Sequence, residues 1–419
     1  MNNKPVHWPS VGQLALAVLT ILFLWSGASA LAILGMVGLV SNNPNFGDAL
    51  PMFLMAMTSV VGGLLMLPSA YYALWRLMDR PTVDSQAILR RLRLQWWILA
   101  LPLVVLAGHL FASHPKIAWL IIPVLHPLAI GIPTIWLLYF AIRRLPLGSS
   151  QRMWGVFDSG LTLGPFLIFV MESLVGLAFL MMLVVYLFSQ PGIMDKILQL
   201  SSLLEQGRSP EALIEDLRPV LVRPVVLFGI LLFGAVAVPM IEEALKPIGV
   251  WLLFGRRLTP AAGFAAGALS GAGYALIESL ALTSSGEAWS SLVLARTGTS
   301  AVHILTAGLT GWALVLTWQK RRFLPLLLAY LCSVMIHGLW NGLTLMYSFN
   351  LLITTTEPSW MSTIVHTVGS SAPVALIFLA MGCFIVLVVI NHSLRRASPG
   401  KEITLAATGV NEGPDESVL

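Results

Sequence analysis

Apolar stretches of about 20 residues or more follow one another along almost the whole chain, and this feature restricts the fold more than any other. An α-helix of about that length crosses a bilayer, whereas membrane strands alternate apolar and polar residues with a period of two. The stretches here are continuous, so they predict helices. We expect ten spans, at residues 11–40, 51–77, 95–112, 116–142, 156–189, 224–254, 260–283, 292–318, 323–347 and 372–394.

The composition excludes a soluble globular protein. Charged residues make up only 10% of the chain, against about a quarter in an average soluble domain. So few charges cannot cover a water-facing surface, and we therefore expect an all-α, polytopic membrane helix bundle in contact with the lipid bilayer. The net charge of +5 is spread over short loops rather than gathered on one face, so we expect no nucleic-acid partner.

The loop charges predict the orientation of the bundle. An even number of spans places both termini on one side, and most of the 24 Lys and Arg residues fall in the loops of that side, for example near residues 90–93, 320–322 and 395–401. Cytoplasmic loops carry such an excess, so both termini are expected in the cytoplasm. The first apolar stretch continues to Val40, which favours a retained helix over a signal peptide.

Five regions are expected along the chain. Apolar spacing in the outer segment predicts amphipathic helices on the membrane surface or over the mouth of the bundle, and the polar end of the chain predicts a disordered tail. The regions are 1–189, an N-terminal five-helix membrane region; 190–222, the extracytoplasmic amphipathic segment; 223–347, a four-helix core; 348–396, a final loop and transmembrane helix; and 397–419, the cytoplasmic tail.

Ionisable residues inside the spans concentrate in the four-helix core. Each such group costs several kcal/mol in a membrane and is a functional hypothesis by default. The polar residues of the four core spans are Glu242, Glu243, Lys246, Glu278, Arg296, His303, His337 and Asn341. Glu172, in the fifth span, belongs to no motif, and either a hydrogen bond to a neighbouring helix or a contact with substrate explains it.

The spacing of these residues indicates that they converge. Glu242 and Lys246 are four residues apart on one helical face, and so are His337 and Asn341. The seventh span also carries a ribbon of small residues that lets neighbouring helices approach closely: Gly263, Gly267, Gly271 and Gly273. Close approach predicts that the glutamates of the sixth span meet the histidines of the eighth and ninth.

Carboxylates, imidazoles and an amide are the groups of a hydrolytic site. A glutamate can take a proton from water. Histidines can bind a metal or stabilise an oxyanion, and an amide can donate to that oxyanion. Lys246 and Arg296 can hold the extra carboxylates ionised. Peptide hydrolysis fits this set, since a helix bundle can admit a water molecule and an unwound substrate strand.

Four motifs in this order resemble the PrsW family of intramembrane proteases, which is related to the type II CAAX prenyl endopeptidases. They are "EEALK" at 242–246, "GALSGAGYALIES" at 267–279, the lone His303, and "HGLWN" at 337–341. Tyr274 and Ser279 stand where the family pattern usually has Phe and Asn. The resemblance covers spans six to nine, and the first five spans carry none of these motifs.

The resemblance implies an intramembrane endopeptidase that cuts a membrane-anchored protein or peptide, such as an anti-sigma factor, in a prokaryotic plasma membrane. It assigns Glu243 as catalytic base or metal-side carboxylate, with Glu242 as its partner. His303 and His337 are then metal ligands or water-positioning groups. A zinc ion held by these two histidines and Glu243, and a metal-free glutamate site, both stay open.

The remaining site residues take supporting roles in this resemblance. Asn341 corresponds to an oxyanion donor. Glu278 corresponds either to a third metal ligand or to the counter-ion of Arg296, and Lys246 supports the glutamates. A structural ion pair between helices is the plainer explanation for Lys246, but one lysine leaves a second carboxylate unpaired.

Two other function classes compete with a protease. A proton- or ion-coupled transporter also places glutamate and histidine inside the membrane, but transporters often show inverted repeats, and here the polar residues crowd one half of the chain. A non-catalytic membrane scaffold on a protease-like fold would tolerate the loss of Glu243 or His337. The full set of polar residues favours the protease over both.

Overall fold

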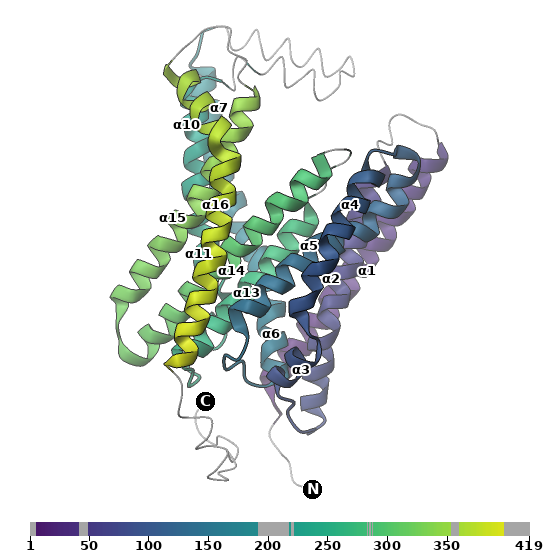
Figure 1. The fold of residues 1–419 in the computed structure, drawn as a ribbon, viewed down its shortest axis with the longest axis vertical. Helices are drawn as coiled ribbons and strands as arrows, with labels where there is room; N and C mark the ends of the chain where they lie inside the picture. The colour runs from purple at the N-terminus through teal and green to yellow at the C-terminus, as the bar shows by residue number, and fades with distance from the viewer. Residues whose placement is uncertain are drawn as a thin grey trace.

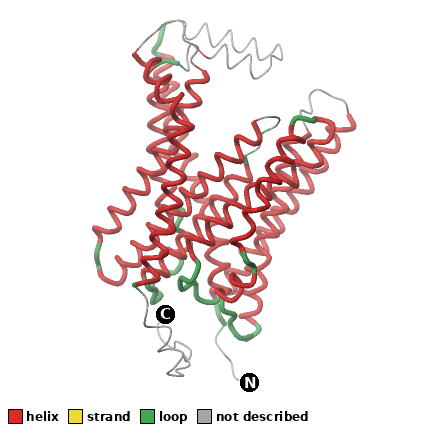
Figure 2. The backbone as a smooth tube through the Cα atoms, in the orientation of Figure 1, coloured by secondary structure: helices red, strands yellow, loops and turns green. Residues whose placement is uncertain are grey.

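The computed structural model describes residues 6–41, 49–191, 218, 222–282, 284, 286, 288–352 and 360–397. This part of the chain contains helices and no strand (Figure 2), apart from an isolated β-bridge between Asp84 and Ser149. The expected all-α class is therefore confirmed. The expected outer segment 190–222 and the tail 397–419 lie almost wholly outside the described residues.

Ten helical stretches of the described chain are long and apolar enough to cross a membrane, as the apolar runs predict. The first five comprise α1 (Trp8–Ser41), α2 (Ala49–Leu77), α3 (Ser85–Arg91) with the 3₁₀ helix η2 (Leu94–Ala100) and α4 (Leu101–Ala112), α5 (Pro115–Ile142), and α6 (Ser150–Leu161) with α7 (Leu163–Phe188). The second five comprise α10 (Pro224–Leu232) with the π-helical turn η3 (Phe233–Ala237), α11 (Val238–Leu245) and α12 (Ile248–Trp251), then α13 (Pro260–Ala281), α14 (Ala288–Lys320), α15 (Phe323–Leu352) and α16 (Trp360–Arg396).

Helix α1 begins and helix α16 ends at the same end of the bundle (Figure 1), as an even number of crossings requires. Helices α13 and α14 form its centre. Figure 1 shows α1, α2 and α4 on one side of them and α7, α10, α15 and α16 on the other. In the most apolar 18-residue segment of each span, 89% of the residues are buried in α13 and 83% in α14. The corresponding share is 6% in the span formed by α6 and α7. The outer helices therefore present most of their surface to lipid, and α13 and α14 are the protein interior.

The small residues of α13 allow this close packing. A Cβ atom on Gly263 would lie 2.6 Å from the carbonyl oxygen of Gly311 on α14, and one on Gly271 would lie 2.5 Å from the carbonyl oxygen of His303. On the opposite face, a Cβ on Gly273 would lie 2.5 Å from the carbonyl oxygen of Phe157 on α6. The predicted glycine ribbon is thus confirmed, and it sets the distance between α13 and the helix that carries His303.

Two spans that the sequence predicts as single helices are interrupted. The fifth begins at Ser150 rather than 156 and changes direction at Thr162, whose φ of −126° and ψ of −66° are not helical. The sixth changes to a π-helical turn just before Pro239 and breaks again at Pro247. Proline has no N–H to donate and clashes with the preceding turn, which explains both changes in the sixth span. These interruptions determine where the glutamates of α11 point.

Candidate functional site

The predicted polar residues of four spans meet in one buried cluster around the ammonium group of Lys246. The side chain of Lys246 has no exposed surface, and its Nζ lies 2.8 Å from Oε2 of Glu242 and 2.8 Å from Oε1 of Glu243. The same Nζ lies 2.6 Å from Nδ1 of His303 on α14 and 3.2 Å from Nδ1 of His337 on α15. A single cation thus contacts both carboxylates and both imidazoles.

The break in the sixth span positions Lys246. Lys246 is the residue after the last turn of α11, and Pro247 interrupts the helix beyond it. The hydroxyl of Ser270 on α13 donates to the carbonyl of Lys246 at 2.6 Å and accepts from the N–H of Gly249 at 3.3 Å. Ser270 therefore satisfies one carbonyl and one N–H of the backbone where the helix is interrupted.

The π-helical turn before α11 is held from α15. The side-chain amide of Asn341 donates to the carbonyl of Gly234 at 3.0 Å. Gly338, one turn earlier on α15, packs directly against the carbonyl oxygen of Ala235, so a Cβ there would overlap it. Asn341, predicted as an oxyanion donor, is thus placed on the backbone of η3, where it fixes the start of the helix that carries Glu242 and Glu243.

His303 is oriented by a carboxylate behind it. Its Nε2 lies 2.7 Å from Oε2 of Glu278, and the same oxygen lies 2.6 Å from Nη2 of Arg296. A carboxylate paired with arginine only accepts hydrogen bonds, so Nε2 of His303 carries the proton and Nδ1 keeps its lone pair. That lone pair faces Lys246. Glu278 is thus paired with Arg296, as its expected counter-ion role requires, and it contacts a histidine as well.

His337 is oriented by the carboxylate of Glu243 on α11. Its Nδ1 lies 3.0 Å from Oε1 of Glu243. If Nδ1 donates to that carboxylate, Nε2 is the acceptor nitrogen, and it lies 3.9 Å from Oε2 of Glu242. The two histidine rings are 5.1 Å apart at their centres and stand at 86° to each other. Each imidazole is therefore fixed by its own glutamate.

The cluster is buried except at one edge. Glu243, Lys246 and His303 have no exposed side-chain surface, and His337 has 2%, but 32% of the Glu278 side chain is exposed. With neutral histidines, the three carboxylates of Glu242, Glu243 and Glu278 exceed the two cations by one charge. The second carboxylate oxygen of Glu243 is buried without a hydrogen-bond partner. A water molecule or a further cation would complete the cluster.

The donor atoms present fit a catalytic zinc ion. Ligand atoms of Glu242, His303 and His337 all lie within 4.8 Å of one another. Two imidazoles and one carboxylate form a known zinc ligand set that leaves one position open for water. The predicted set contained Glu243 in place of Glu242. Glu243 instead contacts Lys246 and His337 with one oxygen, at the edge of this group.

Two residues of the cluster carry no role in the sequence motifs. Besides Ser270, the ring of Tyr274 meets His303 edge to face, with centres 5.2 Å apart, and lies 5.0 Å from Nζ of Lys246. Their spacing in the sequence could have predicted this, because residues 270 and 274 are eight and four residues before Glu278 and share its face of α13. Ser279, which stands where the family pattern has Asn, accepts a hydrogen bond of 2.9 Å from Nε of Arg296.

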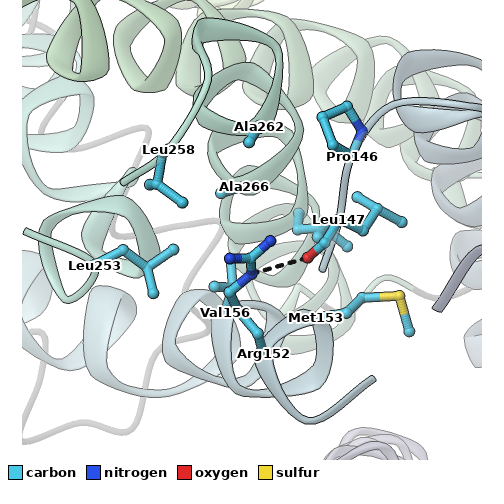
Figure 3. Close-up of a pocket in the computed structure, with 10 residues that line it drawn as sticks. Pro146, Leu147, Arg152, Met153, Val156, Leu253, Leu258, Ala262 and Ala266 are labelled. Carbon is cyan, nitrogen blue, oxygen red and sulfur yellow. Dashed lines mark hydrogen bonds between the residues drawn. The ribbon is translucent and has the colours of Figure 1, made fainter. Parts of the chain in front are cut away.

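A separate small pocket lies between α6, α13 and the segment after α12, away from this cluster (Figure 3). Arg152 borders it and donates from Nε to the carbonyl of Leu147 at 3.0 Å. Leu253, Leu258 and Ala266 make the rest of its wall apolar. Its volume of about 10 Å³ holds at most one water molecule, so it is not a substrate site.

The comparisons with known proteins identify the region that contains the cluster. Residues 212–368 match the model of the PrsW family intramembrane metalloprotease. This match confirms the resemblance read from the four motifs and covers all of the motif residues. No curated protein and no solved structure matches the chain.

Proposed function

We propose, from the PrsW-family match of residues 212–368, that this multi-pass membrane protein is an endopeptidase acting inside the bilayer. The observation that carries the proposal is the convergence of Glu242, Glu243, His303 and His337 on one buried point. Acids and imidazoles are costly in a membrane, and a structural ion pair needs only one carboxylate for the lysine. The extra acid and the two oriented imidazoles are what a hydrolytic site requires.

Glu243 is the proposed general base. One of its carboxylate oxygens is held by Lys246 and His337, and the other is buried without a partner. That free oxygen is the group available to take a proton from water. Lys246 lies next to it and is a donor available to an oxyanion that forms there. Asn341 can donate to the oxyanion only if its side-chain amide first gives up its hydrogen bond to the Gly234 carbonyl.

The proposed metal ligands are Glu242, His303 and His337. A zinc ion bound there would lower the pKa of its water ligand to about 7 and so supply hydroxide at neutral pH. Glu278 would then be the carboxylate that orients His303, the arrangement usual behind metal-bound histidines. The alternative, a metal-free glutamate site, predicts that chelators leave the activity unchanged.

The proposed substrate is a membrane-anchored protein or peptide, and an anti-sigma factor or similar regulator is the expected class. Glu278, the exposed edge of the cluster, is where the substrate strand is expected to enter. The proposed location is a prokaryotic plasma membrane, as the motif resemblance implies, with both termini in the cytoplasm, as the loop charges predict.

The test uses purified full-length protein in detergent with a set of single-span candidate substrates. Cleavage is expected for the wild type and is expected to disappear in Glu243→Gln and His337→Ala. Matched controls are Asp84→Asn, on an exposed cytoplasmic-side loop, and His366→Ala, on the exposed part of α16; both should cleave normally. Persistent cleavage by the two site variants would show that this cluster is not the active site.

Metal analysis of the same samples decides the cofactor. About one zinc ion per chain is expected in the wild type, with loss of zinc and activity in a chelator and recovery of both on adding zinc. A full activity without metal would assign the reaction to Glu243 alone. A transporter instead predicts no cleavage and a proton or ion flux that depends on Glu243 in reconstituted vesicles.

A further inference from the structure

Two helices of the N-terminal five-helix region each hydrogen-bond one of the two central helices of the bundle. Helix α5 packs against both α13 and α14, and α2 packs against α13. The hydroxyl of Thr58 on α2 donates to the carbonyl of Leu280 on α13 at 2.8 Å. The hydroxyl oxygen of Thr134 on α5 lies 2.9 Å from that of Ser300 on α14. These two contacts join the N-terminal region to the helices that carry Glu278 and His303.

Thr58 satisfies a carbonyl group at the end of the helix that carries Glu278. Helix α13 ends at Ala281, and the backbone of Leu282 is extended. The last four carbonyl groups of an α-helix have no partner within the helix, and the carbonyl of Leu280 is one of them. Thr58 is 6% exposed, so water has little access to this contact. The hydroxyl of Thr58 therefore fixes the last turn of α13, in which Glu278 lies.

Thr134 contacts α14 between two residues of the site. Arg296, Ser300 and His303 follow one another at spacings of four and three residues, which places them on one face of this helix. The arginine and the histidine both contact Oε2 of Glu278, at 2.6 and 2.7 Å. Thr134 and Ser300 are each 1% exposed. This buried hydroxyl pair opposes a rotation of α14 that would move Arg296 and His303 away from Glu278.

The hydrogen bonds of this pair make its removal simple to interpret. Oγ1 of Thr134 also lies 2.8 Å from the carbonyl oxygen of Ile130, and Oγ of Ser300 lies 3.0 Å from that of Arg296. A hydroxyl group has one proton, so one member of the pair donates to the other helix and the other member donates within its own helix. In Thr134→Val the bond between α5 and α14 is lost, and Ser300 still donates to the carbonyl of Arg296.

We propose that Thr58 and Thr134 are positioning residues that hold α13 and α14 so that Glu278 orients His303. Both threonines lie outside residues 212–368, the part of the chain that matches the family model. The N-terminal region thus acts on the geometry of the site and is more than a membrane scaffold. This inference rests on the proposed function for its first readout, which is peptide cleavage. Its second readout is the hydrogen bond between Glu278 and His303, which is measured without substrate.

The first experiment measures kcat and KM of the full chain in vesicles with a single-span substrate that the wild type cleaves. Thr58→Val and Thr134→Val should each lower kcat about fivefold, the effect of one lost hydrogen bond, with little change in KM. Thr58→Ser and Thr134→Ser keep the hydroxyl group and should recover most of the loss. Ser59→Ala is the matched control, because the hydroxyl of Ser59 bonds the carbonyl of Met55 in its own helix. This control should keep wild-type kinetics.

A second variant breaks the contact of Thr134 from the side of α14. Ser300→Ala should lower kcat to about the same extent as Thr134→Val. Wild-type kcat in both Thr58→Val and Thr134→Val would overturn the inference. Serine variants as slow as the valine variants would also overturn it, because the shape of the side chain would then matter rather than its hydroxyl group. A higher KM with unchanged kcat would place the two threonines in substrate binding and contradict a positioning role.

The second experiment follows the proton on Nε2 of His303 by NMR in protein labelled with ¹⁵N-histidine, and it needs no activity. The signal is assigned by its absence in His303→Gln. Because Nε2 lies 2.7 Å from the carboxylate of Glu278, this proton should exchange slowly with water in the wild type. Exchange should become about fivefold faster in Thr58→Val and Thr134→Val, as the loss of one hydrogen bond predicts.

The exchange rate separates this inference from the proposed function. It should stay at the wild-type value in Ser59→Ala. Wild-type exchange in both valine variants would show that the N-terminal region does not position Glu278 and His303. If the wild type cleaves no candidate substrate, the proposed function fails, and the exchange of the His303 proton still decides whether the two threonines hold the site.

Discussion

The ammonium nitrogen of Lys246 lies 2.6 Å from Nδ1 of His303, and it uses the one ring nitrogen that Glu278 leaves free. The ammonium group of Lys246 therefore occupies the position at this nitrogen that a metal ion would need. The cluster balances buried carboxylates with a cation that belongs to the chain itself. Binding of a divalent ion to His303 would require Lys246 to move away from that nitrogen.

Replacement of Lys246 by Met should destabilise the protein, since two buried carboxylates lose their partner. Breaking a buried pair by removing one member typically costs about 3–5 kcal/mol, and we expect a clear fall in melting temperature in detergent. Added Zn²⁺ should restore part of the loss in Lys246→Met, because a divalent cation then replaces the missing charge. An unchanged melting temperature, or no response to zinc, would contradict this account of Lys246.

Replacement of Glu278 by Gln should lower activity by about 10–100-fold, the usual effect of removing a carboxylate that orients a catalytic or ligating histidine. Glu278 is bonded to Nε2 of His303 and to Arg296. Arg296→Lys keeps the charge beside Glu278 and should have the smaller effect. Steady-state cleavage rates of the three proteins test this order, and a larger loss in Arg296→Lys than in Glu278→Gln would reverse the assignment.

Replacement of Gly271 by Ala should destabilise the protein by about 1–3 kcal/mol, as overpacking does in a tight interior. The new Cβ would lie 2.5 Å from the carbonyl oxygen of His303, so α14 must shift and carry the imidazole with it. Gly382→Ala on α16 is the matched control, because nothing lies within 4 Å of a Cβ there. Equal melting temperatures for the two variants would show that α13 and α14 are not packed as described.

Replacement of Asn341 by Ala should cost about 1 kcal/mol of stability, the net value of one hydrogen bond, because the Gly234 carbonyl loses its donor. The expected functional effect is a lower kcat through α11, which begins next to this turn. Hydrogen exchange of the backbone around residues 233–238 should become faster in the variant. Unchanged exchange together with a lost activity would favour the oxyanion role and contradict the anchoring role.

Much of the arrangement follows from the sequence. Long apolar runs predict the ten spans, since a backbone in lipid must satisfy its own hydrogen bonds. The glycine spacing of α13 predicts close packing. The costly placement of Glu243, His303 and His337 in three apolar runs predicts that they meet, because an isolated charge in a membrane is unfavourable.

Other features depend on three-dimensional contacts that spacing does not show. Prolines in the sixth span indicate a disturbance, but the π-helical turn and its contact with Asn341 require the packing of α15. Glu242 rather than Glu243 belongs to the candidate metal-binding group because adjacent residues on a helix point about 100° apart.

Cleavage in ¹⁸O-labelled water tests the central claim most directly. Wild-type protein in vesicles is incubated with a single-span substrate in labelled water, and the product termini are analysed by mass spectrometry. A peptidase at this cluster predicts one ¹⁸O atom in the new C-terminal carboxylate at a site within the membrane-spanning segment, and no product in Glu243→Gln. Equal labelled product from Glu243→Gln, or cleavage confined to the soluble part of the substrate, would contradict the account.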